Sequence, residues 1–499
     1  MRKVMIICLL IICFTLCSCE EPVRIEIPVG EKITEDFKVN SYFNDNAIIE
    51  ASSSINIVGV SEEGVVMIAS VYDNKGKLVS QNYGIAGLDN TFSITINTPS
   101  ASTKEYKLEI KDSFDTYIHT YNNIKFGEVW LINTNELTEV DEISDNNIKH
   151  KNIGYYYVNK EVSSWETNEN ISSYIKKLAE KIYQQHESLI SNDVPIGIIV
   201  LDTEKSNLYE WVSKNNIDRV KYLKDYLVRN DLYDSQMTSN LYEKMLKPLE
   251  GIKFTGYIWH FSDNDSSFSL GKNYEKAYAI MLNLLTNYFC DAFGENVKKV
   301  FIQSESSTIE SIEILRTHQM NNSYYFSNTY LIPTYDLNVL YDEELNENNI
   351  VEIDENKLID RIIKVVFDGV RPSGYSKLVS LYNEKEELTK VSIYISNTDY
   401  LMCDISDADY IAENGLKFLK IYDVNNNLID LDYVINNNVI EIDLEIKDII
   451  SEDVKDVPLE KQYYQISRIE YDVKKENGNC WIYNDENIPL LPFTIEVGK

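Results

Sequence analysis

The chain is poor in positive charge and, beyond its first 19 residues, in cysteine. It has 499 residues with 47 Lys and Arg against 80 Asp and Glu, giving a formal net charge of −33. Such a surface repels nucleic acid and anionic lipid headgroups, so we expect no nucleic-acid partner. Cys290, Cys403 and Cys480 are scattered, odd in number and without metal-site spacing. We therefore predict no metal, no cofactor and no disulfide framework.

No segment beyond residue 19 is long and apolar enough to cross a bilayer. The apolar run over residues 4–16 follows Arg2 and Lys3, which is typical of a secretion signal. The sequence Leu-Cys-Ser-Cys at 16–19 resembles a bacterial lipobox with Cys19 as the lipidated residue; a plain cleaved signal or an uncleaved N-terminal helix is the alternative. We predict that residues 1–18 are removed. The lipid on Cys19 would be the only membrane contact, holding the protein at the bacterial cell envelope, periplasmic or on the outer surface.

Alternation of polar and apolar residues dominates both ends of the mature chain. It appears over residues 24–27, 65–72, 91–96 and 106–110, and strand candidates return over 391–395, 418–424, 439–446 and 466–473. A period of two is the signature of a half-buried strand. We predict β-sandwich domains over residues 19–125 and 373–499.

Residues 126–372 alternate strand-like apolar runs with helical patterns. A helical stripe precedes the apolar run 196–201, and a second stripe over 274–289 precedes the run 300–302. The first stripe consists of Ile171, Tyr174, Ile175, Leu178 and Ile182. This order predicts an α/β class protein with a central three-layer domain, in which crossover helices cover a parallel sheet.

The central domain opens on residues 126–138, which read FGEVWLINTNELT. An apolar run over 129–132 ends in a polar cluster, as expected where a buried strand enters a catalytic loop. FGEVWL is similar to the GEVWL opening of the sialate O-acetylesterase family, a branch of the SGNH (GDSL-like) hydrolases. The resemblance continues in PIGII at 195–199 and in CWIYNDENIPLLPF at 480–493. It implies an SGNH-like domain between β domains and a sugar acetyl ester as substrate.

The catalytic positions implied by this resemblance are all replaced. Aligned without a gap, the nucleophilic serine becomes Glu136, and the glycine pair of the oxyanion hole becomes Glu204 and Lys205. The oxyanion asparagine becomes Asp265 and the histidine becomes Ile353, with no histidine anywhere after residue 318. A glutamate nucleophile would give a mixed anhydride that collapses back to the ester, and an ionised aspartate accepts hydrogen bonds but donates none. We therefore expect a non-catalytic relative.

Several residues near these positions are candidates for ligand binding. Indole rings stack on sugars, although core packing is the more common role of tryptophan. Glu136, Asp202, Glu204, Asp263 and Asp265 would suit Ca²⁺ if they faced one cleft, but an acidic protein has acidic loops in any case. The ligand-binding candidates are Glu136, Trp211, Trp259, His260, Asp263 and Arg316. Arg316 and Gln319 match an Arg-x-x-Gln feature of the family, which predicts a pair that anchors a helix.

Three functional hypotheses follow. The first is a surface lipoprotein that binds a glycan or a cell-envelope protein without catalysis. The second is a carbohydrate O-acetyl esterase with relocated residues, in which His260 or His318 is the base and Ser262 or Ser304 the nucleophile. The third is a structural or adhesive lipoprotein that acts through its β domains.

Overall fold

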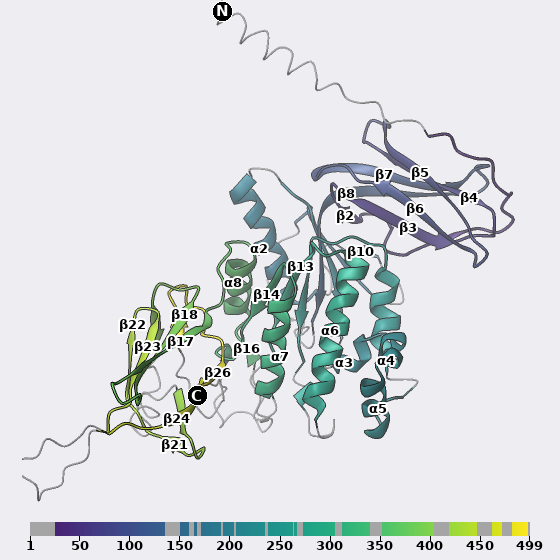
Figure 1. Ribbon diagram of the computed structural model, residues 1–499. Helices are drawn as coiled ribbons and strands as arrows, with labels where there is room; N and C mark the ends of the chain where they lie inside the picture. The colour runs from purple at the N-terminus through teal and green to yellow at the C-terminus, as the bar shows by residue number, and fades with distance from the viewer. Residues whose placement is uncertain are drawn as a thin grey trace, which may run out of the picture.

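The structure is a computed structural model. It describes residues 25–134, 150–158, 164–166, 171–190, 193–203, 206–234, 238–262, 264–266, 273–304, 312–339, 352–403, 419–446, 462–471 and 482–497. Figure 1 shows a sheet flanked by helices in the middle of the molecule and a β-rich region at each end. The predicted α/β class with additional β-rich regions is confirmed at this level. The proposed signal and Cys19 lie outside the described residues.

The N-terminal β region consists of two antiparallel groups of strands. β1 (Lys38–Val39), β3 (Ser54–Val60) and β6 (Thr91–Asn97) form one sheet. β4 (Val66–Tyr72), β5 (Leu78–Ile85) and β7 (Ser102–Asp112) pair in a second group that continues into β8. Every second residue of β6 is buried, and these side chains join those of β4 and β7 in one hydrophobic core. The alternation in β6 thus reflects one buried and one exposed face, whereas β4 is buried along nearly its whole length, contrary to the half-buried strand expected over 65–72.

Strand β8 (Ile118–Asn133) passes without interruption from the N-terminal region into the central sheet. Its first half pairs antiparallel with β7, and its second half pairs parallel with β11 and β12. β2 (Ile48–Glu50) lies parallel to it at residues 125–127. The position 125/126, where the sequence suggests a domain boundary, therefore lies inside a single strand.

The central sheet has the strand order β10-β9-β11-β8-β12-β13-β14, and all its neighbours are parallel except β10 and β9. Its strands are buried on both faces, which explains why they read as unbroken apolar runs. Besides β8 they are β9 (Ile153–Tyr157), β10 (Trp165–Glu166), β11 (Ile196–Leu201), β12 (Gly256–His260), β13 (Lys298–Ile302) and β14 (Thr329–Ile332).

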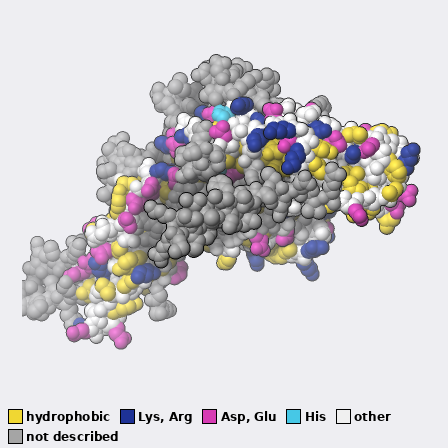
Figure 2. Space-filling view, turned by 90° about the horizontal axis from the view of Figure 1, so that it is seen from above, with side chains coloured by type: hydrophobic (Ala, Val, Ile, Leu, Met, Phe, Trp, Pro, Cys, Tyr) yellow, Lys and Arg dark blue, Asp and Glu magenta, His cyan; other side chains and the backbone are white. Residues whose placement is uncertain are grey.

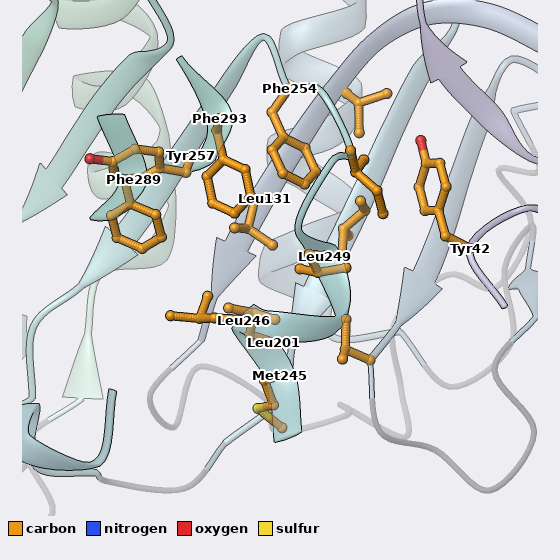
Figure 3. Close-up of a cluster of buried hydrophobic side chains, with 14 of the residues drawn as sticks. Tyr42, Leu131, Leu201, Met245, Leu246, Leu249, Phe254, Tyr257, Phe289 and Phe293 are labelled. Atoms are coloured by element: carbon orange, nitrogen blue, oxygen red, sulfur yellow. The ribbon is translucent and has the colours of Figure 1, made fainter. Parts of the chain in front are cut away.

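Helices cover both faces of this sheet. α2 (Ser173–Ile190) and α8 (Glu355–Val366) pack on one face, and the predicted stripe of α2 is buried there. α3 (Leu208–Trp211), α4 (Lys214–Arg219), α5 (Lys221–Arg229), α6 (Tyr274–Phe293) and α7 (Ile312–Tyr325) lie on the other. The short helices η1 (Tyr242–Leu246), η2 (Lys247–Leu249) and η3 (Asn264–Ser266) join them. Figure 3 shows part of the core on this second face, which is continuous with the core of the N-terminal β region and in which Tyr257 of β12 lies near Phe289 and Phe293 of α6.

The C-terminal β region has two four-stranded antiparallel sheets and a short ladder around one core. The first sheet is β17 (Gly374–Tyr382), β18 (Leu388–Ser396), β23 (Val439–Asp443) and β22 (Tyr433–Asn436). The second is β21 (Leu428–Ile429), β20 (Leu419–Asp423), β24 (Ile466–Tyr471) and β26 (Phe493–Glu496). The ladder is β19 (Leu401–Cys403) with β25 (Ile482–Asn484).

One short segment near the C-terminus enters all three hydrophobic cores. Ile488 packs with α2 and α8, Leu490 with the C-terminal sheets, and Leu491 with the core on the far side of the central sheet. The Tyr335 hydroxyl donates to the carbonyl of Leu490, and the Leu491 amide donates to the carbonyl of Ser373 at 2.9 Å. Residues 488–491 therefore fasten the C-terminal region to the central one.

None of the helices in the described ranges is long and apolar enough to cross a membrane.

Candidate functional site

The carboxyl ends of the parallel strands meet at one edge of the central sheet, which we call the carboxyl edge. Ligands of open α/β sheets bind in the crevice outside this edge. The polar residues that end or follow these strands, strand by strand from β11 to β14, are Asp202, Thr203, Asn133, Thr134, His260, Ser262, Gln303, Ser304 and Thr334. This edge is the candidate functional site.

Asn133 fixes the ends of the two central strands to each other. Its amide nitrogen Nδ2 donates to the carbonyl of His260 at 3.1 Å, and its Oδ1 accepts from the His260 amide at 2.6 Å. The Asn133 side chain is fully buried. The strand predicted from the apolar run therefore ends in a buried asparagine side chain that is hydrogen-bonded to the backbone of the neighbouring strand. Glu136, three residues on, lies outside the described residues.

The imidazole of His260 is buried on the face covered by α2. Its Nε2 lies 3.0 Å from the hydroxyl of Tyr174. Burial lowers the pKa of His260 from its usual 6.5 to about 3, so the ring is neutral at physiological pH. A group this weakly basic is poorly matched to general-base catalysis near pH 7.

Both candidate nucleophiles have hydrogen-bond partners other than an imidazole. The Ser304 hydroxyl donates to the carbonyl of Ser262 at 3.2 Å and accepts from Nε2 of Gln319 at 2.8 Å. The Ser262 hydroxyl accepts from the Asn264 amide at 3.1 Å. The other candidate base, His318, is half-buried on α7, where burial lowers its pKa.

Arg316 and Gln319 anchor α7 to the end of β13, as the Arg-x-x-Gln feature of the family resemblance predicts. The Arg316 guanidinium donates through Nε and Nη2 to the carbonyl of Ser304 at 3.0 and 2.9 Å. Gln319 accepts from the Ser304 amide at 3.3 Å and donates to the Tyr278 hydroxyl at 2.8 Å. Arg316 is only 1% exposed, so the structure gives it a packing role in place of the predicted contact with a ligand.

Asp265 also serves the interior of the protein. Its two carboxyl oxygens accept from the Leu208 amide at 3.1 and 3.2 Å, and Oδ1 also accepts from the Tyr274 hydroxyl. It thereby ties the start of α3 to the start of α6. With 4% exposure it does not face an open cleft, so the alternative of acidic side chains gathered in one cleft does not extend to Asp265.

The two candidate tryptophans belong to the hydrophobic core. Trp211 and Trp259 are each 2% exposed, and their rings meet edge to face at a centroid distance of 4.9 Å. The Trp211 ring nitrogen donates to the Ser206 hydroxyl at 2.8 Å. Neither ring offers a free face to a sugar, which agrees with the more common core role and not with the alternative of sugar stacking.

The remaining predicted positions are only partly covered. Glu204, Lys205 and Asp263 lie outside the described residues. Ile353 lies in β16 (Glu352–Ile353), which pairs with β15 (Asn338–Val339). Within the described part of the chain, no group of three or more His, Cys, Asp and Glu side chains is arranged to hold a metal ion.

A buried ion pair beside the site was missed from the sequence. Arg361 of α8 donates through Nη1 and Nη2 to the two carboxylate oxygens of Asp336, both at 2.8 Å. The two side chains are 6% and 5% exposed. This pair fixes the loop after β14. The available signal was an arginine within the apolar stripe formed by Leu358, Ile362 and Val365.

Comparison with known proteins supports the fold alone. No family model and no curated protein sequence matches the chain. The solved structure of a carbohydrate acetylesterase from Xanthomonas citri aligns over 93% of this chain and 100% of its own, with a TM-score of 0.67 and 12% identity. A β-glucuronidase from Bifidobacterium dentium aligns over 67% of this chain and 58% of its own, with a TM-score of only 0.23 and 8% identity. The chain therefore has a carbohydrate-esterase-like fold.

Proposed function

We propose that this protein is a non-catalytic surface lipoprotein that keeps the fold of a carbohydrate esterase and binds a glycan or a cell-envelope protein. The observation that carries the proposal is the pairing of polar groups at the carboxyl edge. The side chains of Ser262, Ser304, Asp265 and Arg316 are each hydrogen-bonded to neighbouring protein groups.

Ester hydrolysis by a serine enzyme needs an exposed nucleophile, a base within reach of it, and donors aimed at the developing oxyanion. Ser304 is fully buried, and its hydroxyl proton is directed at the carbonyl of Ser262. Asp265 accepts hydrogen bonds, which is the opposite of what an oxyanion requires. These arrangements support a site that has lost its chemistry, in agreement with the replaced positions Glu136, Glu204, Asp265 and Ile353.

The carbohydrate part of the proposal rests on the fold and on the resemblance to the sialate O-acetylesterase family, which is an argument by analogy. We further propose that residues 1–18 are a signal peptide and that Cys19 carries the lipid. The mature chain would then comprise β domains over 19–125 and 373–499 around an SGNH-like domain over 126–372. Strand β8 runs without interruption from the unit over 19–125 into the unit over 126–372 and so couples these two.

An acetyl-ester assay tests the loss of catalysis. Purified mature protein should release no acetate above background from aryl acetates or O-acetylated sugars, and Ser262→Ala and Ser304→Ala should leave that background unchanged. Turnover that disappears in either variant would instead establish the hypothesis of relocated catalytic residues. A glycan array with the same protein tests binding, since a non-catalytic glycan binder should retain a defined set of sugars.

The β-rich ends favour a second candidate, adhesion. Hydrophobic side chains lie exposed at both ends of the molecule (Figure 2). Leu381 and Tyr382 of β17 are 50% and 55% exposed, and Val60 and Ile85 of the N-terminal region are 51% and 55% exposed. The test compares two double variants, one with Leu381 and Tyr382 changed to Ser and one with Val60 and Ile85 changed to Ser. If only the first variant loses binding to cell-envelope material, the adhesive function lies in the C-terminal sheet.

A further inference from the structure

The opposite, amino edge of the central sheet holds a carboxyl group that the proposed function does not use. Glu50 ends β2, the N-terminal strand that lies parallel to β8, with Glu50 opposite Gly127. It stands where β8 leaves the N-terminal β region and enters the parallel sheet. A polar side chain here can hold the two regions together.

The Glu50 carboxyl bridges elements of both regions. Its Oε2 accepts from the Val129 amide of β8 at 2.9 Å. The Thr255 hydroxyl, just before β12, lies 3.0 Å from each of its two oxygens. The Thr255 amide in turn donates to the Val129 carbonyl at 2.8 Å. The carboxyl therefore joins β2 to the point where β8 and the start of β12 meet.

The remainder of this contact is apolar. Ile48 of β2 packs over Gly154 and Gly197, where an added Cβ atom would lie 3.1 Å from the isoleucine side chain. The ring nitrogen of Trp165 donates to the carbonyl of Tyr42 at 2.9 Å. The Glu50 carboxyl is thus the ionisable member of a packed contact between β2 and the sheet.

Of the titratable groups near Glu50, one carboxylate opposes a negative charge on it. Glu128 of β8 is a like charge, and Tyr42 precedes β2. His186 of α2 lies 3.0 Å from Oε2 of Glu128. Strand β11, which also contacts β2, carries no titratable side chain.

We propose that Glu50 is a proton-controlled latch between the N-terminal β region and the central sheet, closed most firmly when its carboxyl is neutral. Burial and the Glu128 charge raise the pKa of Glu50 from 4.5 to about 8, against the lowering effect of its hydrogen bonds, although the residue keeps some accessible surface. When the latch opens, the carboxyl reaches water and regains its ordinary pKa.

The direction of the pH effect follows from the difference between the pKa of Glu50 in the closed state and its pKa in the open state. Below pH 4.5 the carboxyl is neutral in both states and the latch is at its strongest. Between pH 4.5 and about 8 only the open state loses its proton, so the opening equilibrium rises about tenfold for each pH unit and then levels off. Mild acid tightens the junction and a rise toward pH 8 loosens it.

Native-state hydrogen exchange on the full mature protein tests the latch. The reporters are the amides of Ala51, Lys125 and Val129, which bond across the junction. After correction for intrinsic exchange, their opening equilibrium in the wild type should rise about a hundredfold from roughly pH 5.5 to 7.5. Glu50→Gln, which keeps an acceptor oxygen but cannot ionise, should show no such rise.

Glu105→Gln is the matched control, because it makes the same chemical change on an exposed residue of β7 and should keep the wild-type slope. A wild-type slope in Glu50→Gln, or a flat profile in the wild type, would overturn the proposal. If Glu50→Gln does not fold, Thr255→Val replaces it. Removing a donor that favours the ionised form should move the levelling of the profile to higher pH, and an unmoved profile would contradict the latch.

Discussion

The two edges of the central sheet show how one physical effect, removal of an ionisable group from water, has opposite consequences. At the carboxyl edge burial lowers the pKa of His260, and at the amino edge it raises the pKa of Glu50. Each group is thereby held neutral. The histidine makes the fold sensitive to acid, whereas the glutamate makes it sensitive to rising pH.

The two edges also differ in which parts of the molecule the hydrogen bonds of their polar side chains connect. At the carboxyl edge Ser304, Arg316 and Gln319 join the end of β13 to α7, with further hydrogen bonds to the end of β12 and to α6. At the amino edge Glu50 connects strands from two regions of the molecule. The comparison teaches that perturbed pKa values, which mark many functional sites, also accompany packed contacts inside the fold, of His260 with Tyr174 and of Glu50 with Thr255.

The largest effect should come from breaking the ion pair at the carboxyl edge. Arg361→Met leaves the buried Asp336 carboxylate without its partner and should lower the free energy of unfolding by about 3–5 kcal/mol. Urea unfolding measures the loss. Arg229→Met is the matched control, since this arginine is 78% exposed and should change stability by less than about 0.5 kcal/mol. A loss below about 1 kcal/mol in Arg361→Met would show that this edge is not held by the pair.

The pH dependence of stability should separate the two edges. His260 stays neutral in the fold down to about pH 3, while in the unfolded chain it gains a proton below about pH 6.5. Its contribution is therefore complete above pH 6.5 and is lost as the pH falls, by about 2 kcal/mol at pH 5. His260→Gln should flatten the acid side of a curve of unfolding free energy against pH and leave the slope above pH 6.5 unchanged.

Glu50→Gln is the counterpart in that measurement, because it should flatten the curve of unfolding free energy between pH 4.5 and about 8. Above pH 6.5 the two variants should therefore differ, since His260→Gln keeps the wild-type slope there. Identical curves for the two variants would remove the distinction between the edges.

The smallest effect is expected at the candidate nucleophile. Ser304→Ala removes two hydrogen bonds, one from Gln319 and one to the carbonyl of Ser262, but leaves the bond of Gln319 to the Tyr278 hydroxyl, so the cost should be about 1–2 kcal/mol. Ser54→Ala, on an exposed position of β3, should cost less than about 0.5 kcal/mol. Thermal unfolding measures both. A loss well above 3 kcal/mol would mean that the whole network depends on this hydroxyl.

Local patterns were sufficient for the strands and helices that position the site. The apolar runs at 129–132 and 196–201 lie in the buried strands β8 and β11, and the stripe of Tyr174 and Ile182 is the buried face of α2. The Arg-x-x-Gln feature, taken from the family resemblance, correctly predicted that Arg316 and Gln319 anchor a helix, and α7 places both on the same face one turn apart.

The surroundings of individual side chains could not be predicted from the sequence. Trp211 ends α3 and Trp259 lies near the end of β12, so the sequence alone allows both to line a cleft. Only the packing of α3 against β12 and α6 shows them to be core residues. The environment of Glu50 arises from Thr255, which lies more than two hundred residues further along the chain. Likewise, no pattern in the sequence indicates that strand β8 continues across the expected domain boundary at 125/126.

The position of residues 488–491 in the chain has a consequence for biosynthesis. Ile488, Leu490 and Leu491 contribute to three separate cores, yet they are translated after every helix and strand of the central sheet. Until they emerge from the ribosome, each core keeps an uncovered apolar gap, whichever parts have already folded. A chain whose cores are completed so late is exposed to aggregation for longer during synthesis than one whose cores are closed by an early segment.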